Sequence, residues 1–339
     1  MSFKQRRMLL GGISVFAYLF LQSISLANEP VTGATMQSPV NLKFGAVPSL
    51  LYLPVYIAIE NGYFKKRNIN VEIINVSNPV PALIAGDVDF LMRSADASIL
   101  AAAQGKYIPA VVMLQQRTTF TLNLSSRLRE IAGSRQYPAN IRILKGKMIT
   151  VGISARGSTS EFLVKRAFSD AEMAEGKDYT MVVLGSGANL VTALVNGRVD
   201  AVSVWPPFSQ AAEASGAPAL VVNYDEAGVA VLTNTTFIAQ RRDVVENVIA
   251  AIVEAEQFNR DVEKNIDALI TIAKKYAGAS DDNILLPAIK QEASLAYPGV
   301  DCAAWEVAFR NQMSAGTLTR QLACSDVVAD IAPKGPIGP

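Results

Sequence analysis

The feature that most constrains the fold is a short segment that occurs twice. Residues 82–89 read ALIAGDVD and residues 193–200 read ALVNGRVD, so six of the eight positions are identical or both aliphatic. In each copy an apolar helix ends at Gly, a residue that readily follows a helix end, and a strand then starts with Val-Asp. Both copies lie at the same point of an alternating strand–helix order. We therefore expect two α/β lobes of one architecture, each with a mostly parallel sheet covered by helices.

The hydrophobic pattern predicts the same order of elements in both halves of the chain. The first half has strands near 41–49, 69–76 and 88–92, with helices near 53–62, 79–86 and 95–104. The second half has strands near 148–153, 180–185 and 199–204, with helices near 159–169 and 188–196. The rest of the chain has apolar residues at helical spacing, which predicts helices near 244–258, 264–276, 281–292 and 301–314.

The chain is expected to cross between the lobes twice, which makes a two-strand hinge. The alternating, Thr-rich stretch 117–124 predicts the first crossing, and 229–239 predicts the return. The first lobe is then discontinuous, with residues 40–122 and 232–332, and the second lobe is 123–231.

The first 27 residues have the pattern of a cleavable export signal. Lys4, Arg6 and Arg7 precede the apolar run 8–21, and Ser-Leu-Ala at 25–27 ends at the cleavage position. An uncleaved anchor is the alternative, although the apolar run is short for a bilayer span. The stretch QRRMLL also resembles a twin-arginine signal, so both the Sec and the twin-arginine route stay open. We expect a soluble periplasmic protein.

The composition excludes several classes of function. There is no histidine, so a Ser-His-Asp triad, a Cys-His pair and a His-ligated metal are all excluded. Lys plus Arg number 31 and Asp plus Glu 30, a balance that does not favour nucleic-acid binding. We expect no catalytic residues, no metal and no cofactor.

The two cysteines, Cys302 and Cys324, lie close together in the sequence near the C-terminus. In an oxidising compartment such a pair favours a disulfide, and two buried thiols are the alternative. Closing a loop of about 20 residues stabilises a fold by roughly 3 kcal/mol.

Ligands of open parallel sheets bind beyond the carboxyl ends of the strands. Four turns lie at such ends in this chain, at 46–52, 93–98, 154–160 and 203–208. In the third, Ser158, Thr159 and Ser160 follow Gly157 at the start of a helix. No Lys follows, so this is no nucleotide P-loop, and the G-x-S-x-G pattern of a nucleophile elbow is absent. The turn is therefore either a seat for an anion or polar group, or a plain helix cap.

The other turns leave similar alternatives. Asp96 follows Ser94 at a helix start, where it either caps the helix or faces the cleft and attracts an amine or hydroxyl. Arg93 and Arg156 flank two of the turns and either clamp an anion or lie in solvent. Trp205 either forms a flat wall for the ligand or packs under the hinge.

Longer stretches resemble a known family. The run LPVYIAIENGYFKKRNINVEI at 53–73, together with 82–90, 146–162 and 193–208, is similar in order and content to the taurine, nitrate and aliphatic-sulfonate family of periplasmic binding proteins. That family also includes pyrimidine-precursor binding proteins and a pyrimidine-synthesising enzyme that depends on His and Cys. The segment 125–147 departs from the family pattern, because it looks longer and more basic.

The resemblance implies a type II periplasmic binding fold in which two lobes close on a small molecule. It also implies a membrane permease of an ABC importer as partner, and we expect a monomer. The implied ligand contacts, with Thr119 in the crossing stretch added, are Ser49, Tyr52, Ser94, Asp96, Thr119, Ser158, Thr159, Ser160 and Trp205.

Two other functions compete with transport. A sensor module would need the same lobe closure and would pass ligand occupancy to a receptor. An exported enzyme without histidine would need two carboxylates in the cleft, and Asp96 and Asp225 are the candidates.

Overall fold

The computed structural model describes residues 38–76, 79–220 and 225–335. The predicted export signal, residues 1–27, lies outside the described residues. No helix in the part of the chain that the structure describes is long and apolar enough to cross a membrane.

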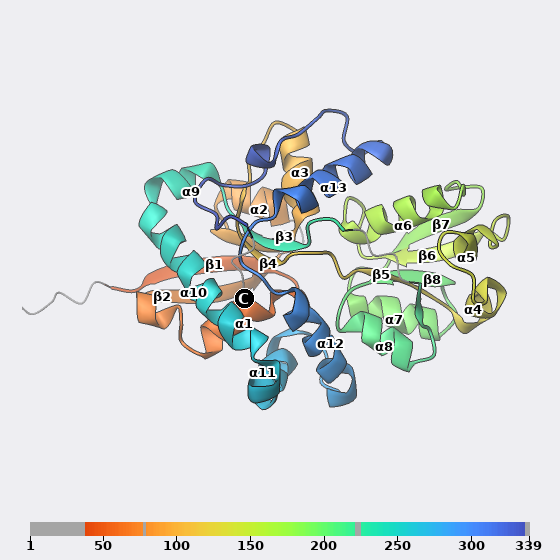
Figure 1. Cartoon of the computed structure of the whole chain (residues 1–339), viewed down its shortest axis with the longest axis horizontal. Helices are drawn as coiled ribbons and strands as arrows, with labels where there is room; N and C mark the ends of the chain where they lie inside the picture. The colour runs from red at the N-terminus through yellow and green to blue at the C-terminus, as the bar shows by residue number, and fades with distance from the viewer. Residues whose placement is uncertain (1–37, 77–78, 221–224, 336–339) are drawn as a thin grey trace, which may run out of the picture. The chain divides into compact units, whose positions relative to one another are not determined.

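Two five-stranded sheets organise the chain (Figure 1). The first has the order β2 (Ile69–Asn75), β1 (Val40–Ala46), β3 (Phe90–Ser94), β10 (Val229–Leu232) and β4 (Ala110–Gln115). The second has the order β7 (Tyr179–Val183), β6 (Ile149–Ile153), β8 (Ala201–Val204), β5 (Thr121–Leu124) and β9 (Ala219–Leu220). The same arrangement therefore occurs twice, and we call the sheets with their helices the first and the second lobe.

Both sheets are mixed, which refines the predicted mostly parallel sheets. β1 pairs in parallel with β2 and β3, and β6 pairs in parallel with β7 and β8. β10 runs antiparallel to β3 and β4, and β5 runs antiparallel to β8 and β9. The two reversed strands are those that the chain forms directly after leaving the other sheet, so each enters its sheet from the opposite end. The lobe limits in residue numbers stay a prediction.

The predicted helices follow the strands in the predicted order, and four further α-helices in the described part of the chain, within 126–142, 208–214 and 235–240, were not predicted. The first lobe has α1 (Leu53–Glu60), α2 (Pro79–Ala85), α3 (Ala95–Ala103), α9 (Thr235–Gln240), α10 (Arg242–Arg260), α11 (Val262–Tyr276), α12 (Asp282–Leu295) and α13 (Cys302–Ser314). The second lobe has α4 (Ser126–Ala132), α5 (Ala139–Arg142), α6 (Thr159–Asp170), α7 (Gly187–Val195) and α8 (Phe208–Ala214). The divergent segment 125–147 contains the short helices α4 and α5.

The repeated segment has one structural role in both lobes. Asp89 accepts the backbone N–H of Lys43 on β1 at 2.8 Å, and Asp200 accepts that of Thr150 on β6 at 3.0 Å. Each aspartate thus ties the start of one parallel strand to the next. The Gly before it takes a positive φ, 81° at Gly86 and 65° at Gly197, which glycine adopts without strain.

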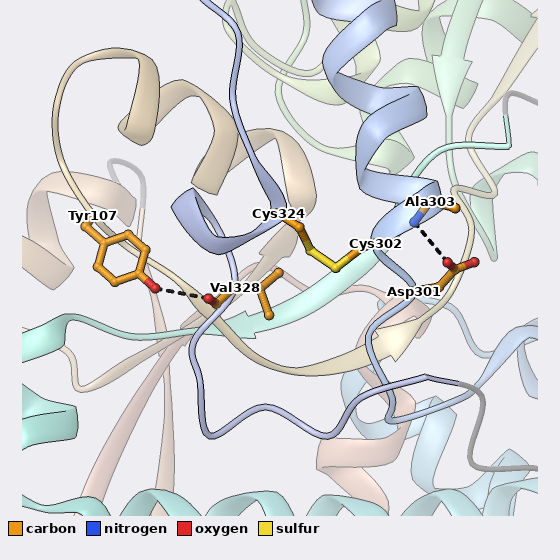
Figure 2. The surroundings of a disulfide bond; sticks show 6 residues. All are labelled: Tyr107, Asp301, Cys302, Ala303, Cys324 and Val328. Atoms are coloured by element: carbon orange, nitrogen blue, oxygen red, sulfur yellow. Dashed lines mark hydrogen bonds between the residues drawn. A yellow bond between two sulfur atoms is a disulfide. The ribbon is translucent and has the colours of Figure 1, made fainter.

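The predicted disulfide is confirmed. Cys302 at the start of α13 is bonded to Cys324, with a Cα–Cα distance of 5.7 Å (Figure 2). Asp301 caps the same helix end by accepting the N–H of Ala303 at 3.0 Å. The other end of α13 reaches the boundary between the lobes, as described below.

Candidate ligand-binding site

A cavity of about 500 Å³ lies where turns at the carboxyl ends of β1, β3, β6, β7 and β8 come together. Both lobes contribute to its wall. Seven of the predicted contact residues line it: Ser49, Tyr52, Ser94, Asp96, Ser158, Thr159 and Trp205. This volume is in the range of sites for small organic molecules.

Two predicted contacts do not reach the cavity wall. The Ser160 side chain is fully buried, because its hydroxyl donates to the Ser203 carbonyl at 3.0 Å and accepts the N–H of Ser154 at 3.2 Å. Thr119 is buried beside Glu292 of α12, and burial raises the pKa of that carboxyl to about 8. Ser160 therefore belongs to the packing of α6 against the ends of β6 and β8, and Thr119 to the packing of the crossing stretch against α12.

The hydroxyls at the start of α6 are engaged within the protein. Ser158 caps the helix by accepting the N–H of Glu161 at 3.4 Å, and its own hydroxyl donates to the Ala155 carbonyl at 2.7 Å. Glu161 accepts the N–H of Gly157 at 2.6 Å, and Arg156 donates to the same carboxylate at 2.8 Å. The chain thus supplies an anion of its own to this helix end.

Thr159 and Asp96 join the two lobes directly. The Thr159 hydroxyl on α6 lies 2.6 Å from Asp96 Oδ2 and 2.5 Å from the Ser94 hydroxyl. Gln312 of α13 donates to Asp96 Oδ1 at 2.5 Å. Burial raises the Asp96 pKa, against the effect of these hydrogen bonds and of Arg93. Asp96 is only 7% exposed, so it serves mainly as a junction between α3, α6 and α13.

Glu226, which sequence reasoning missed, lies near this junction. Burial, together with the nearby Asp96 charge, raises the Glu226 pKa to about 7. Asn311 of α13 donates to Glu226 at 2.9 Å and accepts a hydrogen bond from Arg166 of α6 at 3.0 Å. Asp225, the sequence candidate for a second carboxylate, is highly exposed and pairs with Arg117 away from the cavity.

Arg93 is the only Lys or Arg among the described residues that line the cavity. It lies near the Tyr52 hydroxyl, whose pKa is raised by burial and lowered in part by Arg93. Arg156, the other flanking arginine, pairs instead with Glu161 and Glu175. The first lobe therefore brings one positive charge to the cavity.

Three aromatic rings form an apolar part of the wall. The Trp205 ring lies 5.3 Å from Phe120 and 5.7 Å from Phe208, measured between ring centroids. The Trp205 indole N–H is buried and has no hydrogen-bond partner among the described residues. Trp205 thus packs in the fold and also faces the cavity.

The start of α7 is the largest part of the wall that sequence reasoning missed. Gly185, Ser186, Gly187 and Ala188 follow β7 and line the cavity. The signal was present, because a strand ending in Gly-Ser-Gly before a helix obeys the same rule as the four turns that were singled out. Within the described ranges, no group of three acidic or cysteine side chains could hold a metal ion.

Comparison with solved structures defines the class of fold. The alkanesulfonate-binding protein SsuA from Xanthomonas axonopodis pv. citri, bound to MOPS, matches with a TM-score of 0.66 and 16% identity over 86% of this chain and 99% of that one. The ligand-binding component of an ABC-type import system from Staphylococcus aureus, with zinc bound, matches with a TM-score of 0.67 and 16% identity over 86% and 96%. The desulfurization enzyme DSZB matches with a TM-score of 0.59 and 16% identity over 86% and 97%.

The two lobes, the mixed sheets and these likenesses define a type II periplasmic binding fold, as predicted. Residues 51–261 match the model of the NMT1/THI5-like family, and the chain belongs to that family. No curated protein sequence matches the chain.

Proposed function

We propose that the chain is an exported solute-binding protein that captures a small polar or anionic organic molecule between its lobes. It then delivers that molecule to the membrane permease of an ABC importer. The observation that carries the proposal is the cavity itself, whose wall comes from the strand ends of both lobes. A ligand that contacts both lobes favours the closed state of the protein. A partner protein can then distinguish the ligand-bound form from the ligand-free form by its conformation.

The lining favours an organic acid over a simple polar solute. Arg93 supplies a positive charge, several hydroxyls supply hydrogen bonds, and the rings around Trp205 supply apolar contact. The one carboxylate on the wall, Asp96, is engaged by Thr159 and Gln312. The structural likeness to an alkanesulfonate-binding protein and to an import component supports the same interpretation.

Catalysis is the less favoured alternative. One similar structure is a desulfurization enzyme, so the fold alone does not decide. The sequence has no histidine, and its two cysteines are joined in a disulfide, so neither an imidazole nor a thiolate is at hand as base or nucleophile. We therefore propose a binding role without turnover.

A thermal-shift panel tests this proposal on the mature protein. Alkanesulfonates, aromatic sulfonates, carboxylates, nitrate, pyrimidines and riboflavin are each added, and a ligand at a hundred times its Kd stabilises by about 2.7 kcal/mol. We expect Arg93→Gln to lose the response to acids while Arg310→Gln, an exposed change on α13 away from the cavity, keeps it. If no solute raises the melting temperature, the proposal fails, and conversion of a solute would favour an enzyme.

A further inference from the structure

One helix of the second lobe covers two carboxylates of the first lobe. Asp96 stands in the first turn of α3, and Glu226 lies just before β10. The N–H of Ala227 donates to the Ala304 carbonyl at 3.1 Å, which fixes the Glu226 stretch to α13 of the first lobe. From the second lobe, α6 reaches this pair through Thr159, whose hydroxyl lies 2.6 Å from Asp96 Oδ2. Contact between the lobes therefore places α6 over both carboxylates.

A second, small cavity of about 20 Å³ lies between α6 and the two carboxylates. On the side of the first lobe it is lined by Asp96, Glu226, Asn311 and Gln312. Gln312 is only 3% exposed, and its Oε1 atom has no hydrogen-bond partner in the described part of the chain. Three acceptor side chains thus face a space with room for about one water molecule.

The positive charges near the two carboxylates are mostly engaged elsewhere. The charged groups on the surrounding elements are Arg93 of β3, Arg166 and Asp170 of α6, and Arg117, Asp225 and Asp301 beside the crossing stretches. Arg166 pairs with Asp170 at 2.8 Å. Arg117 pairs with Asp301, also at 2.8 Å. Two carboxylates of like charge in a partly enclosed site favour the neutral form of one of them.

Glu226 is the carboxylate that exchanges protons with solvent. It is partly exposed, whereas Asp96 is buried. Burial and the Asp96 charge raise the pKa of Glu226 to about 7. When α6 moves away, both carboxylates face water, and the pKa of Glu226 should return toward that of an ordinary glutamate, about 4.3.

We propose that closure of the two lobes takes up a proton, which Glu226 holds next to Asp96 beneath α6. The inference rests on the proposed function and adds its regulation. A carboxyl whose pKa is higher in the closed state favours that state as the pH falls. Between pH 8 and pH 5 the ratio of closed to open protein should therefore rise at least about tenfold. An acidic medium promotes capture of the ligand, and an alkaline one promotes its release.

Small-angle X-ray scattering of the ligand-free protein between pH 5 and pH 9 tests the proposal. Closed lobes are more compact, so we expect the radius of gyration to fall as the pH falls. Glu226→Gln keeps an acceptor for the Asn311 side chain and is always neutral, so this variant should stay compact at every pH. Glu306→Gln removes the same charge from an exposed position of α13 outside both cavities, and it should respond to pH like the unmodified protein.

The carboxyl ¹³C resonance of Glu226, identified by its loss in Glu226→Gln, shows whether the group titrates. We expect its midpoint to lie near pH 7 in the unmodified protein. If the resonance titrates there but the radius of gyration does not change with pH, Glu226 has only a structural role and the proposal is wrong. A midpoint in the ordinary range of glutamate, or a pH response that persists in Glu226→Gln, would also overturn it.

This test and the thermal-shift panel fail independently, because no ligand is added here. If the panel finds a ligand and the lobes do not respond to pH, proton uptake is wrong and the proposed capture function stands. If the lobes respond to pH through Glu226 but no solute of the panel binds, the proposed function fails and the movement of the lobes with pH remains.

Discussion

The starts of α6 and α7 look alike, but they differ in whether an acidic side chain neutralises the positive end of the helix. Each follows a strand of the second lobe, each has a glycine with positive φ, 72° at Gly157 and 81° at Gly185, and each is capped by a serine. In α6 the third residue after the cap is Glu161, whose carboxylate bonds to Gly157 and pairs with Arg156 and Lys165. In α7 that position is Asn189.

This difference shows that hydroxyl-rich composition alone does not identify an anion site. The α6 turn has more hydroxyls than the α7 turn, but it also carries its own carboxylate and so has little positive field left for a ligand. A Ser-x-x-Glu pattern at a helix start is the sequence signature of such internal compensation. The α7 turn lacks that pattern, and no acidic residue stands in its first helical turn.

The largest expected effect comes from adding one methyl group to each turn. Gly187→Ala places a Cβ 2.1 Å from the Phe208 ring, so we expect the free energy of unfolding to fall by about 3 kcal/mol. At Gly157 a Cβ meets nothing within 4 Å, and only the positive φ opposes alanine, so Gly157→Ala should cost about 1 kcal/mol. Urea unfolding of both variants measures the difference, and equal losses would show that Phe208 does not press on the α7 turn.

The start of α6 also forms a hydrogen bond to the first lobe through Thr159, and removing this bond should have a smaller effect on stability. Thr159→Val keeps the shape but removes the hydroxyl that lies between Asp96 and Ser94. A buried acceptor then loses its donor, so the free energy of unfolding should fall by about 2 kcal/mol. Ligand affinity should fall as well, because the state with the lobes together is weakened.

Thr192→Val on α7 is the matched control. Thr192 is exposed and does not line the cavity, so we expect changes of less than about 0.5 kcal/mol in stability and none in affinity. If Thr159→Val behaves like Thr192→Val in both measurements, the bond between α6 and α3 contributes little to holding the lobes together.

Much of the fold was predictable because it depends on local signals. The period of apolar residues, the glycine helix ends and the repeated Val-Asp gave the order of strands and helices, and most element limits lie within two or three residues of those predicted. The reversal of β5 and β10 was not predictable in the same way. Strand direction in a sheet depends on which end the chain enters from, and that depends on the crossings between lobes rather than on the residues of the strand.

The candidate site was predictable only in part, for a similar reason. The rule on strand ends correctly indicated that Tyr52, Ser94 and Trp205 lie near one cavity. It could not reveal that Thr159 reaches Asp96, because that contact joins residues 63 positions apart in different lobes. Composition also could not show at which helix start a carboxylate of the chain neutralises the positive helix end. Recognising it would have required treating Glu161 as part of the cap of α6.

The smallest expected effect concerns that carboxylate. Glu161→Gln leaves a group that can still accept the Gly157 N–H but removes the charge that pairs with Arg156 and Lys165. Burial raises the Glu161 pKa, but the hydrogen bonds from Arg156, Gly157 and Lys165 outweigh it and hold the pKa below its usual value. The stabilisation is therefore complete above the ordinary carboxyl pKa and is lost as the pH falls through the lowered one. We expect a loss of about 1 kcal/mol at pH 7 that shrinks toward zero in the acid range, measured by urea unfolding at several pH values. A loss that stays constant with pH would mean that the Glu161 charge does not stabilise the start of α6, and the contrast with α7 would then rest on geometry alone.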